Sequence, residues 1–214
     1  MRLKEQMDSI YRKLTLDEIP WNIESPPDVL VDLVYSQWVK PCEAIDLGCG
    51  AGNYAVWLAS RGFRMTGLEI SRNALELAIR LSENNGVSCR FVVDDMTGVV
   101  DGYDCSFDFA YDWEVLHHVF PDDRAQYVGN VHRMLRPGGK YLSVCFSEKE
   151  PPIFGGEGKY RKTPLGTTLY FSSEQELLAL LEPLFNIEEL CTIEISGKSS
   201  PHMAVKALMS KRDA

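Results

Sequence analysis

The stretch "AIDLGCGAGNYAVWLA" at residues 44–59 places Gly48, Gly50 and Gly52 directly after an apolar run. Glycines at such positions let the backbone adopt positive φ angles and approach a ligand closely. The apolar run predicts a buried strand, and "NYAVWLASRG" predicts a helix that ends at Gly62. The stretch therefore predicts a strand, a loop and a helix. It leaves three roles open for the loop: a dinucleotide site, a site for another nucleotide-like cofactor, or a tight turn.

The alternation of strands and helices continues on both sides of this unit. Pro26 and Pro27 fix the start of one helix, and Ser71 can cap another that ends before Gly86. We expect strands at 42–48, 63–70, 89–93, 107–113 and 140–147, helices at 28–38, 53–62, 71–86, 122–135 and 173–181, and a C-terminal hairpin from 185–195 and 203–210. This order predicts an α/β fold with a parallel sheet and helices on both of its faces.

Composition limits the classes of partner. The chain has 214 residues, enough for one domain, and 31 acidic against 22 basic side chains give a net charge of -9. Such a charge repels phosphate backbones and anionic lipid, so we expect no nucleic-acid and no membrane partner. The cysteines lack CxxC spacing, and the N-terminus lacks the apolar stretch of a signal peptide. Both features favour a cytoplasmic protein.

Acidic residues follow several of the predicted strands, at the edge where a parallel sheet binds its ligand. A dinucleotide fingerprint has a third glycine where this chain has Asn53, which weakens the dinucleotide interpretation. Glu69 ends the second strand and can accept both hydroxyls of a ribose. Asp94, Asp95 and Asp112 follow or end later strands.

Over residues 28–147 the chain resembles the class I S-adenosylmethionine-dependent methyltransferases. "AIDLGCGAG" is similar to their first motif, Glu69 to their ribose-binding acid, and "LRPGGKYL" to the turn of their sixth motif. The resemblance implies a Rossmann-like methyltransferase fold over 1–214. Its seven-stranded sheet is mostly parallel, with an antiparallel C-terminal strand and helices on both faces.

The resemblance also implies S-adenosyl-L-methionine as cofactor. Asp46 could order the glycine loop or accept a hydrogen bond from the cofactor's ammonium group, Asp95 could accept from the adenine amino group, and Met96 could pack on the ring. The alternatives are ordinary strand-end acids and core filling. The predicted cofactor-binding residues are Trp21, Asp46, Gly48, Cys49, Gly50, Gly52, Asn53, Glu69, Ile70, Asp95, Met96, Asp112 and Trp113.

The residues "LHH" after the fourth strand supply the candidate catalytic groups. His117 and His118 lie on the side of the fold where the methyl acceptor binds, and either could act as a base. Methyl transfer depends mainly on alignment and exclusion of water, so a base is needed for a weakly acidic hydroxyl and much less for a thiol. The alternative is that one histidine packs and the other is exposed. No Cys or acid joins them at metal-ligand spacing, so we expect no metal site.

The acceptor is predicted to be a small molecule. "YDWE" differs from the Asn-Pro-Pro-Tyr type tetrapeptide of relatives that methylate DNA bases or protein glutamine. Pro20 and Trp21 resemble the N-terminal segment of thiopurine, thiol and halide methyltransferases, which favours a thiol or another soft nucleophile. Residues 1–40 are predicted to cover the cofactor, and 148–171, with Phe154 and Tyr160, to form a substrate lid. Transfer to oxygen or nitrogen, cofactor binding without transfer, and an NAD-dependent enzyme are the alternatives.

Overall fold

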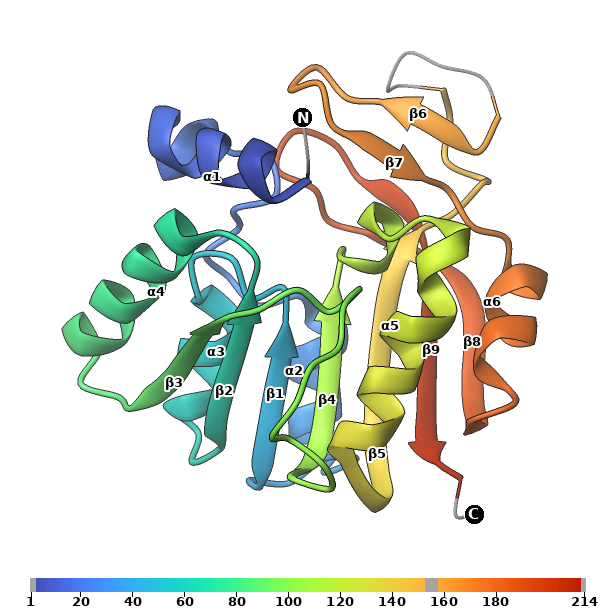
Figure 1. The fold of residues 1–214 in the computed structure, drawn as a ribbon, viewed down its shortest axis with the longest axis horizontal. Coiled ribbons are helices and arrows are strands. Elements are labelled where there is room, and N and C mark those ends of the chain that lie inside the picture. The colour runs from blue at the N-terminus through green and yellow to red at the C-terminus, as the bar shows by residue number, and fades with distance from the viewer. Residues whose placement is uncertain (1–2, 153–157, 213–214) are drawn as a thin grey trace.

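The computed structural model describes residues 3–152 and 158–212, and it confirms the predicted α/β fold (Figure 1). A seven-stranded sheet has the order β3-β2-β1-β4-β5-β9-β8. Neighbouring strands from β3 to β5 pair in parallel, whereas β9 runs antiparallel to both β5 and β8. The strands are β1 (Glu43–Leu47), β2 (Arg64–Glu69), β3 (Cys89–Val93), β4 (Phe107–Trp113), β5 (Leu135–Phe146), β8 (Phe185–Ile195) and β9 (His202–Lys211).

Helices cover both faces of the sheet. On one face, α2 (Asp28–Tyr35) and α3 (Asn53–Ala59) bury apolar side chains against the strands, and α4 (Arg72–Asn84) packs beside α3. On the other face, α5 (Pro121–Met134) and α6 (Glu174–Leu181) enclose a second apolar cluster. The sheet is thus the middle of three layers, with α5 and α6 in front of it in Figure 1 and α2 behind.

The structure contains elements that the sequence analysis did not predict. The N-terminal residues form helix α1 (Leu3–Lys13), whose Met7, Ile10 and Tyr11 are buried. The segment 148–171, for which we predicted no strand, contains a short hairpin of β6 (Tyr160–Lys162) and β7 (Thr168–Tyr170). Phe154, which we placed in a lid, lies outside the described residues.

The added elements lie at one edge of the sheet, where the parallel strands end. Helix α1 and the β6–β7 hairpin lie beyond the carboxyl ends of the strands, at the top of Figure 1. The strand order reverses between β1 and β4, and in open α/β sheets such a switch point is where ligands bind. Among the described residues, no helix is long and apolar enough to cross a membrane.

Candidate active site

A cavity opens at this edge, over the carboxyl ends of β1, β2 and β4. It is bounded above by α1 and by the segment that follows it, including Met7, Tyr11 and Asn22. We call it the first cavity. Its wall brings together most of the predicted cofactor residues, namely Trp21, Asp46, Gly48, Cys49, Gly50, Asn53, Glu69, Ile70, Asp95, Met96 and Trp113.

Glu69 joins the glycine loop to the start of α4. Its carboxylate accepts hydrogen bonds from the backbone N–H of Gly50 at 3.0 Å and of Ser71 at 2.9 Å. Burial raises the pKa of Glu69, and the two N–H donors oppose that shift. A carboxylate offers about four lone-pair sites. Glu69 therefore keeps acceptor capacity for two ligand hydroxyls.

The glycine loop lies against α1. A Cβ on Gly50, whose φ is 52°, would stand 2.7 Å from the Tyr11 hydroxyl oxygen, so a larger residue would displace that ring. The same hydroxyl accepts a hydrogen bond from Trp21 Nε1 at 3.0 Å. Asn53 Nδ2 donates to Asn22 Oδ1 at 2.9 Å. The N-terminal residues are thereby tied over the first cavity.

The remaining predicted contacts differ in how fully the structure supports them. Asp46 is 3% exposed, and burial raises its pKa to about 7. Met96 is buried in the wall, and its carbonyl accepts from Asn130 Nδ2. Asp95 is exposed, and its Oδ1 accepts from the hydroxyl and the N–H of Thr97. Asp94 lines the wall as well, so the geometry does not separate it from Asp95.

Gly52 and Asp112 do not belong to the described cavity walls. A Cβ on Gly52 would lie 2.8 Å from the Ala78 Cβ, so this glycine lets α3 and α4 pack closely. Asp112 is fully buried within the sheet and accepts hydrogen bonds from the hydroxyls of Tyr141 and Ser143. Asp112 therefore has a structural role in this sheet, and its contact with a cofactor stays a prediction.

A second cavity of about 370 Å³ adjoins the first. Its wall comes from the segment after α1, the turn η2 (Leu116–His118), the end of β5, the β6–β7 hairpin and the connection between β8 and β9. Apolar side chains such as Phe146, Leu165 and Leu169 supply much of its surface. The residues that line both cavities are Trp21, Ile23, Glu114 and His118.

The two predicted catalytic histidines occupy different positions. His117 lines only the second cavity, and its ring stacks on Phe146 with centroids 4.4 Å apart. Burial lowers the pKa of His117, which favours the packing interpretation. His118 lines both cavities, and burial lowers its pKa to about 4, so its ring is neutral at pH 7. Within the described chain, His118 Nδ1 has no hydrogen-bond partner.

Sequence reasoning missed several residues of the walls. Glu114 directly follows β4, so the rule that ligands lie beyond strand ends would have found it. Tyr54 follows Asn53 at the start of α3, and Tyr127 faces the first cavity from α5. Lys198 and His202 carried no such signal. They reach the second cavity through a connection that we interpreted only as a hairpin turn.

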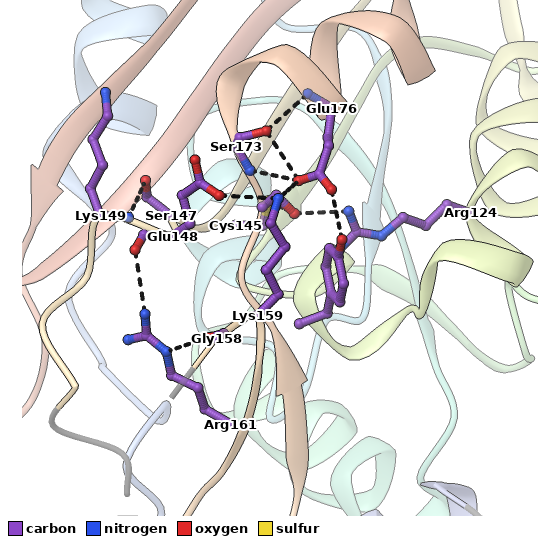
Figure 2. A network of polar contacts seen from close by, with 12 residues as sticks. Arg124, Cys145, Ser147, Glu148, Lys149, Gly158, Lys159, Arg161, Ser173 and Glu176 are labelled. Carbon is purple, nitrogen blue, oxygen red and sulfur yellow. Dashed lines mark hydrogen bonds and ion pairs between the residues drawn. The ribbon is translucent and has the colours of Figure 1, made fainter. Parts of the chain in front are cut away.

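The β6–β7 hairpin is held to the rest of the molecule by charged side chains (Figure 2). Lys159 pairs with Glu148 at 3.0 Å and also with Glu176, the capping residue of α6. Glu176 accepts from the Tyr170 hydroxyl at 2.7 Å. Arg161 donates to the carbonyl of Glu148 and to neighbouring carbonyls. The hairpin is therefore a fixed wall of the second cavity in this structure.

A second set of contacts ties the β8–β9 connection to the N-terminal segment. Lys198 Nζ donates to the carbonyls of Leu16, Ile19 and Asn22 at 3.0 to 3.3 Å. His202 Nδ1 lies 3.0 Å from a carboxylate oxygen of Glu150, a buried residue at the start of the 148–171 segment. These contacts hold the β8–β9 connection against the N-terminal segment and against the start of the 148–171 segment.

The first cavity has the chemistry of a nucleoside site. Glycine backbone, the buried carboxylates of Asp46 and Glu69, and the apolar Met96 surround it. In the described part of the chain, His118 Nδ1 is buried without a hydrogen-bond partner, and His118 lines this wall. Unpartnered buried polar atoms are costly unless a ligand or water satisfies them. The arrangement fits a ligand that carries both polar and apolar groups.

The comparisons with known proteins agree with this chemistry. Residues 44–139 match the model of the family described as "Methyltransferase domain". A 2-heptyl-1-hydroxyquinolin-4(1H)-one methyltransferase of Mycobacteroides abscessus is 28% identical over 72% of this chain and 70% of that protein. A probable thiol methyltransferase 2 of Arabidopsis thaliana is 26% identical over 69% of this chain and 68% of that protein.

The fold has solved counterparts. A structure from work on the conversion of a disulfide bond into a thioacetal group during echinomycin biosynthesis has a TM-score of 0.83 and 23% identity, and the match covers 98% of this chain and 92% of that one. Other curated relatives are matched over only about a third of their length. Fold and site thus define a protein that binds S-adenosylmethionine on a Rossmann-like sheet. The match over residues 44–139 and the similarity to curated methyltransferases indicate an S-adenosylmethionine-dependent methyltransferase.

Proposed function

We propose that this protein transfers the methyl group of S-adenosylmethionine to a small molecule that carries a thiol or a hydroxyl on an apolar ring. The observation that carries the proposal is the wall common to the two cavities. Because Trp21, Glu114 and His118 face both spaces, a cofactor in the first cavity can present its methyl group to an acceptor in the second. Two adjoining sites are what an in-line transfer requires.

The first cavity would hold the cofactor in one orientation. Glu69 would accept from the ribose hydroxyls, and Met96 would pack on the adenine ring near Asp94 and Asp95. Asp46 and the glycine loop would lie at the amino acid end. When bound, S-adenosylmethionine supplies an electrophilic methyl group on a sulfonium. The protein's part is then to align the two molecules and to exclude water.

The second cavity supports an acceptor with a flat, apolar body. Trp21, Phe146 and Leu169 offer aromatic and aliphatic surface, and Glu114 and His118 lie where this wall meets the first cavity. The two curated relatives described above are named for a hydroxyquinolinone and for thiols, which favours a hydroxyl or thiol on such a body. The excess of acidic residues argues against nucleic acid as the acceptor.

We further propose that residues 1–214 act as one methyltransferase domain. The part of 1–40 that the structure describes places Met7, Tyr11 and Trp21 over the first cavity. Residues 163–169 of the predicted lid segment contribute to the second cavity. These residues support a cofactor-covering role for 1–40 and an acceptor-covering role for 148–171, which stay proposals.

Methyl transfer can be tested directly. The purified protein is incubated with S-adenosylmethionine tritiated on its methyl group and with 2-naphthol, 2-naphthalenethiol, 2-naphthylamine or iodide, and labelled product is counted. We expect product with the thiol, the alcohol or both, and none without protein. An inactive panel together with tight cofactor binding would instead favour a cofactor-binding protein without transfer activity.

A further inference from the structure

Glu114 has an unusual backbone conformation at the junction of the two cavities. Its φ angle is 61°, in the left-handed region that non-glycine residues seldom adopt. Its N–H still donates to the Val144 carbonyl at 2.8 Å, so the residue continues the edge of β4 beside β5. Strained conformations of this kind persist where the surrounding structure fixes them, and they cluster at functional sites.

The strain places a carboxylate where methyl donor and acceptor meet. Glu114 lines both cavities, together with Trp21, Ile23 and His118. Of these four, only Glu114 and His118 can exchange a proton near pH 7. Burial lowers the pKa of His118 to about 4, which makes its ring a weak base. Glu114 is therefore the stronger candidate for receiving a proton from an acceptor.

Building on the function proposed above, we propose that Glu114 is the general base that deprotonates a hydroxyl acceptor as the methyl group is transferred. The acceptor O–H proton passes to a Glu114 carboxylate oxygen, and the oxygen lone pair forms the new bond to the methyl carbon. The carbon–sulfur bond breaks, and its electron pair stays on the sulfur, which becomes neutral. Charge and atoms balance, since the carboxylate becomes a carboxylic acid that later releases its proton to water.

The electrostatic surroundings of Glu114 suit this role. Burial raises its pKa to about 7, so at neutral pH the carboxylate is present and is basic enough to accept a proton. The titratable groups that share its two cavities are Tyr11, Asp46, Cys49, Tyr54, Glu69, Asp94, Asp95, Tyr127, His117, His118, Lys198 and His202. The Lys198 ammonium is directed to three carbonyls of residues 16–22.

The test uses a pair of probes that differ only in the reacting atom. An aromatic alcohol such as 2-naphthol is mostly protonated at pH 7.5, whereas 2-naphthalenethiol is largely ionised and needs no base. We expect Glu114→Gln to reduce kcat/KM for 2-naphthol by about 100-fold or more and to change the value for the thiol by less than about threefold. Equal losses with both probes, or no loss with either, would overturn the proposal.

The pH profile separates a base from a residue that only shapes the site. For wild type and 2-naphthol, kcat/KM should fall as pH drops through about 7, because the carboxylate becomes protonated. In Glu114→Gln this inflection should vanish, and the residual rate should rise with pH as naphtholate forms. An unchanged inflection in the variant would assign the titration to another group.

Glycine variants separate the backbone from the carboxylate. Gln37 also has a φ of 61° but belongs to neither cavity wall, so Gln37→Gly is the matched control. Both Gln37→Gly and Glu114→Gly should raise the Tm by about 2–4 °C, since glycine removes the strain. Only Glu114→Gly should also lose 2-naphthol methylation. Retained 2-naphthol methylation in Glu114→Gly would overturn the proposal.

A spectroscopic measurement remains decisive if neither probe is methylated. Titration calorimetry with S-adenosylmethionine first establishes whether the cofactor binds, and failure there contradicts the proposed function and not the role of Glu114. The carboxyl ¹³C signal of Glu114 is assigned as the one that is missing from the spectrum of Glu114→Gln. The chemical shift of this signal is then measured against pH in wild type with S-adenosylhomocysteine bound. Titration near pH 7 supports the proposal, and titration below about pH 5.5 overturns it.

Discussion

The carboxylates of Glu69 and Asp112, near the ends of two parallel strands, have different surroundings. Both residues looked like ligand contacts in the sequence. Glu69 faces the first cavity and holds the glycine loop, whereas Asp112 is buried and faces Tyr141 and Ser143. Asp112 lies inside β4, one residue before its end at Trp113, whereas Glu69 is the last residue of β2. The neighbours Trp113 and Glu114 are the residues of this stretch that reach the cavity.

Asp112→Asn distinguishes the structural role of this residue from cofactor binding. The amide keeps one acceptor oxygen where the carboxylate has two, so one of the two hydroxyls must reverse its hydrogen bond and accept from the NH₂ group. We expect the free energy of unfolding to fall by about 1–3 kcal/mol in urea titrations. Affinity for S-adenosylmethionine should stay within about twofold of wild type by calorimetry. A variant that is as stable as wild type but binds the cofactor tenfold more weakly would contradict a purely structural role for Asp112.

At the scale of elements, the glycine loop explains why α3 begins where it does and how it packs. Gly52 caps α3 with a φ of 84°, and its Cα lies so close to α4 that a Cβ would meet Ala78 at 2.8 Å. A Cβ on Gly48 would likewise overlap the side chain of Val115, and a Cβ on Gly50 would overlap that of Tyr11. The three glycines therefore allow the chain to turn, let it pack closely against its neighbours and leave backbone atoms exposed to a ligand.

Gly52→Ala and Gly86→Ala separate strain from packing. Both glycines have positive φ, but a Cβ on Gly86 would meet no atom within 4 Å among the described residues. We expect Gly86→Ala to cost about 1 kcal/mol of unfolding free energy, from backbone strain alone. Gly52→Ala should cost about 2–4 kcal/mol, because steric overlap with α4 is added. Equal costs in thermal or urea unfolding would mean that α4 moves away freely.

Most of the helices and strands were predictable from the sequence. Apolar periodicity and capping residues such as Ser71 and Ser173 located the central strands and helices, and both serines accept hydrogen bonds at the predicted caps. Helix α1 was missed because charged residues interrupt it, although Met7, Ile10 and Tyr11 lie on one buried face. Lys198 and His202 could not be found, since their place in the second cavity depends on how a distant hairpin folds back.

At the scale of the whole molecule, buried acids make the free energy of unfolding depend on pH. Burial raises the pKa of both Asp46 and Asp112 to about 7, well above their values in an unfolded chain. A raised pKa means that the folded state holds the proton more tightly. The associated stabilisation is complete below about pH 4 and is lost as pH rises through about 7.

The free protein should therefore become less stable as pH rises from about 6.5 to 8, above the range in which the lowered pKa of His118 acts in the opposite sense. Asp46, Asp112 and Glu114 each contribute at most about 1.4 kcal/mol per pH unit within that window. Urea unfolding at several pH values measures the slope, and Asp112→Asn should make it shallower by removing one titrating group. A free energy of unfolding that is constant or rises towards pH 8 would contradict the protonation states assigned to these acids.

The central claim is that the first cavity binds S-adenosylmethionine through Glu69, and isothermal titration calorimetry tests it most directly. We predict that wild type binds one cofactor per chain, that Glu69→Gln weakens binding by about 10- to 100-fold, and that Glu76→Gln, at an exposed position of α4, leaves it unchanged. No binding to wild type, or equal affinity in wild type and Glu69→Gln, would contradict the account.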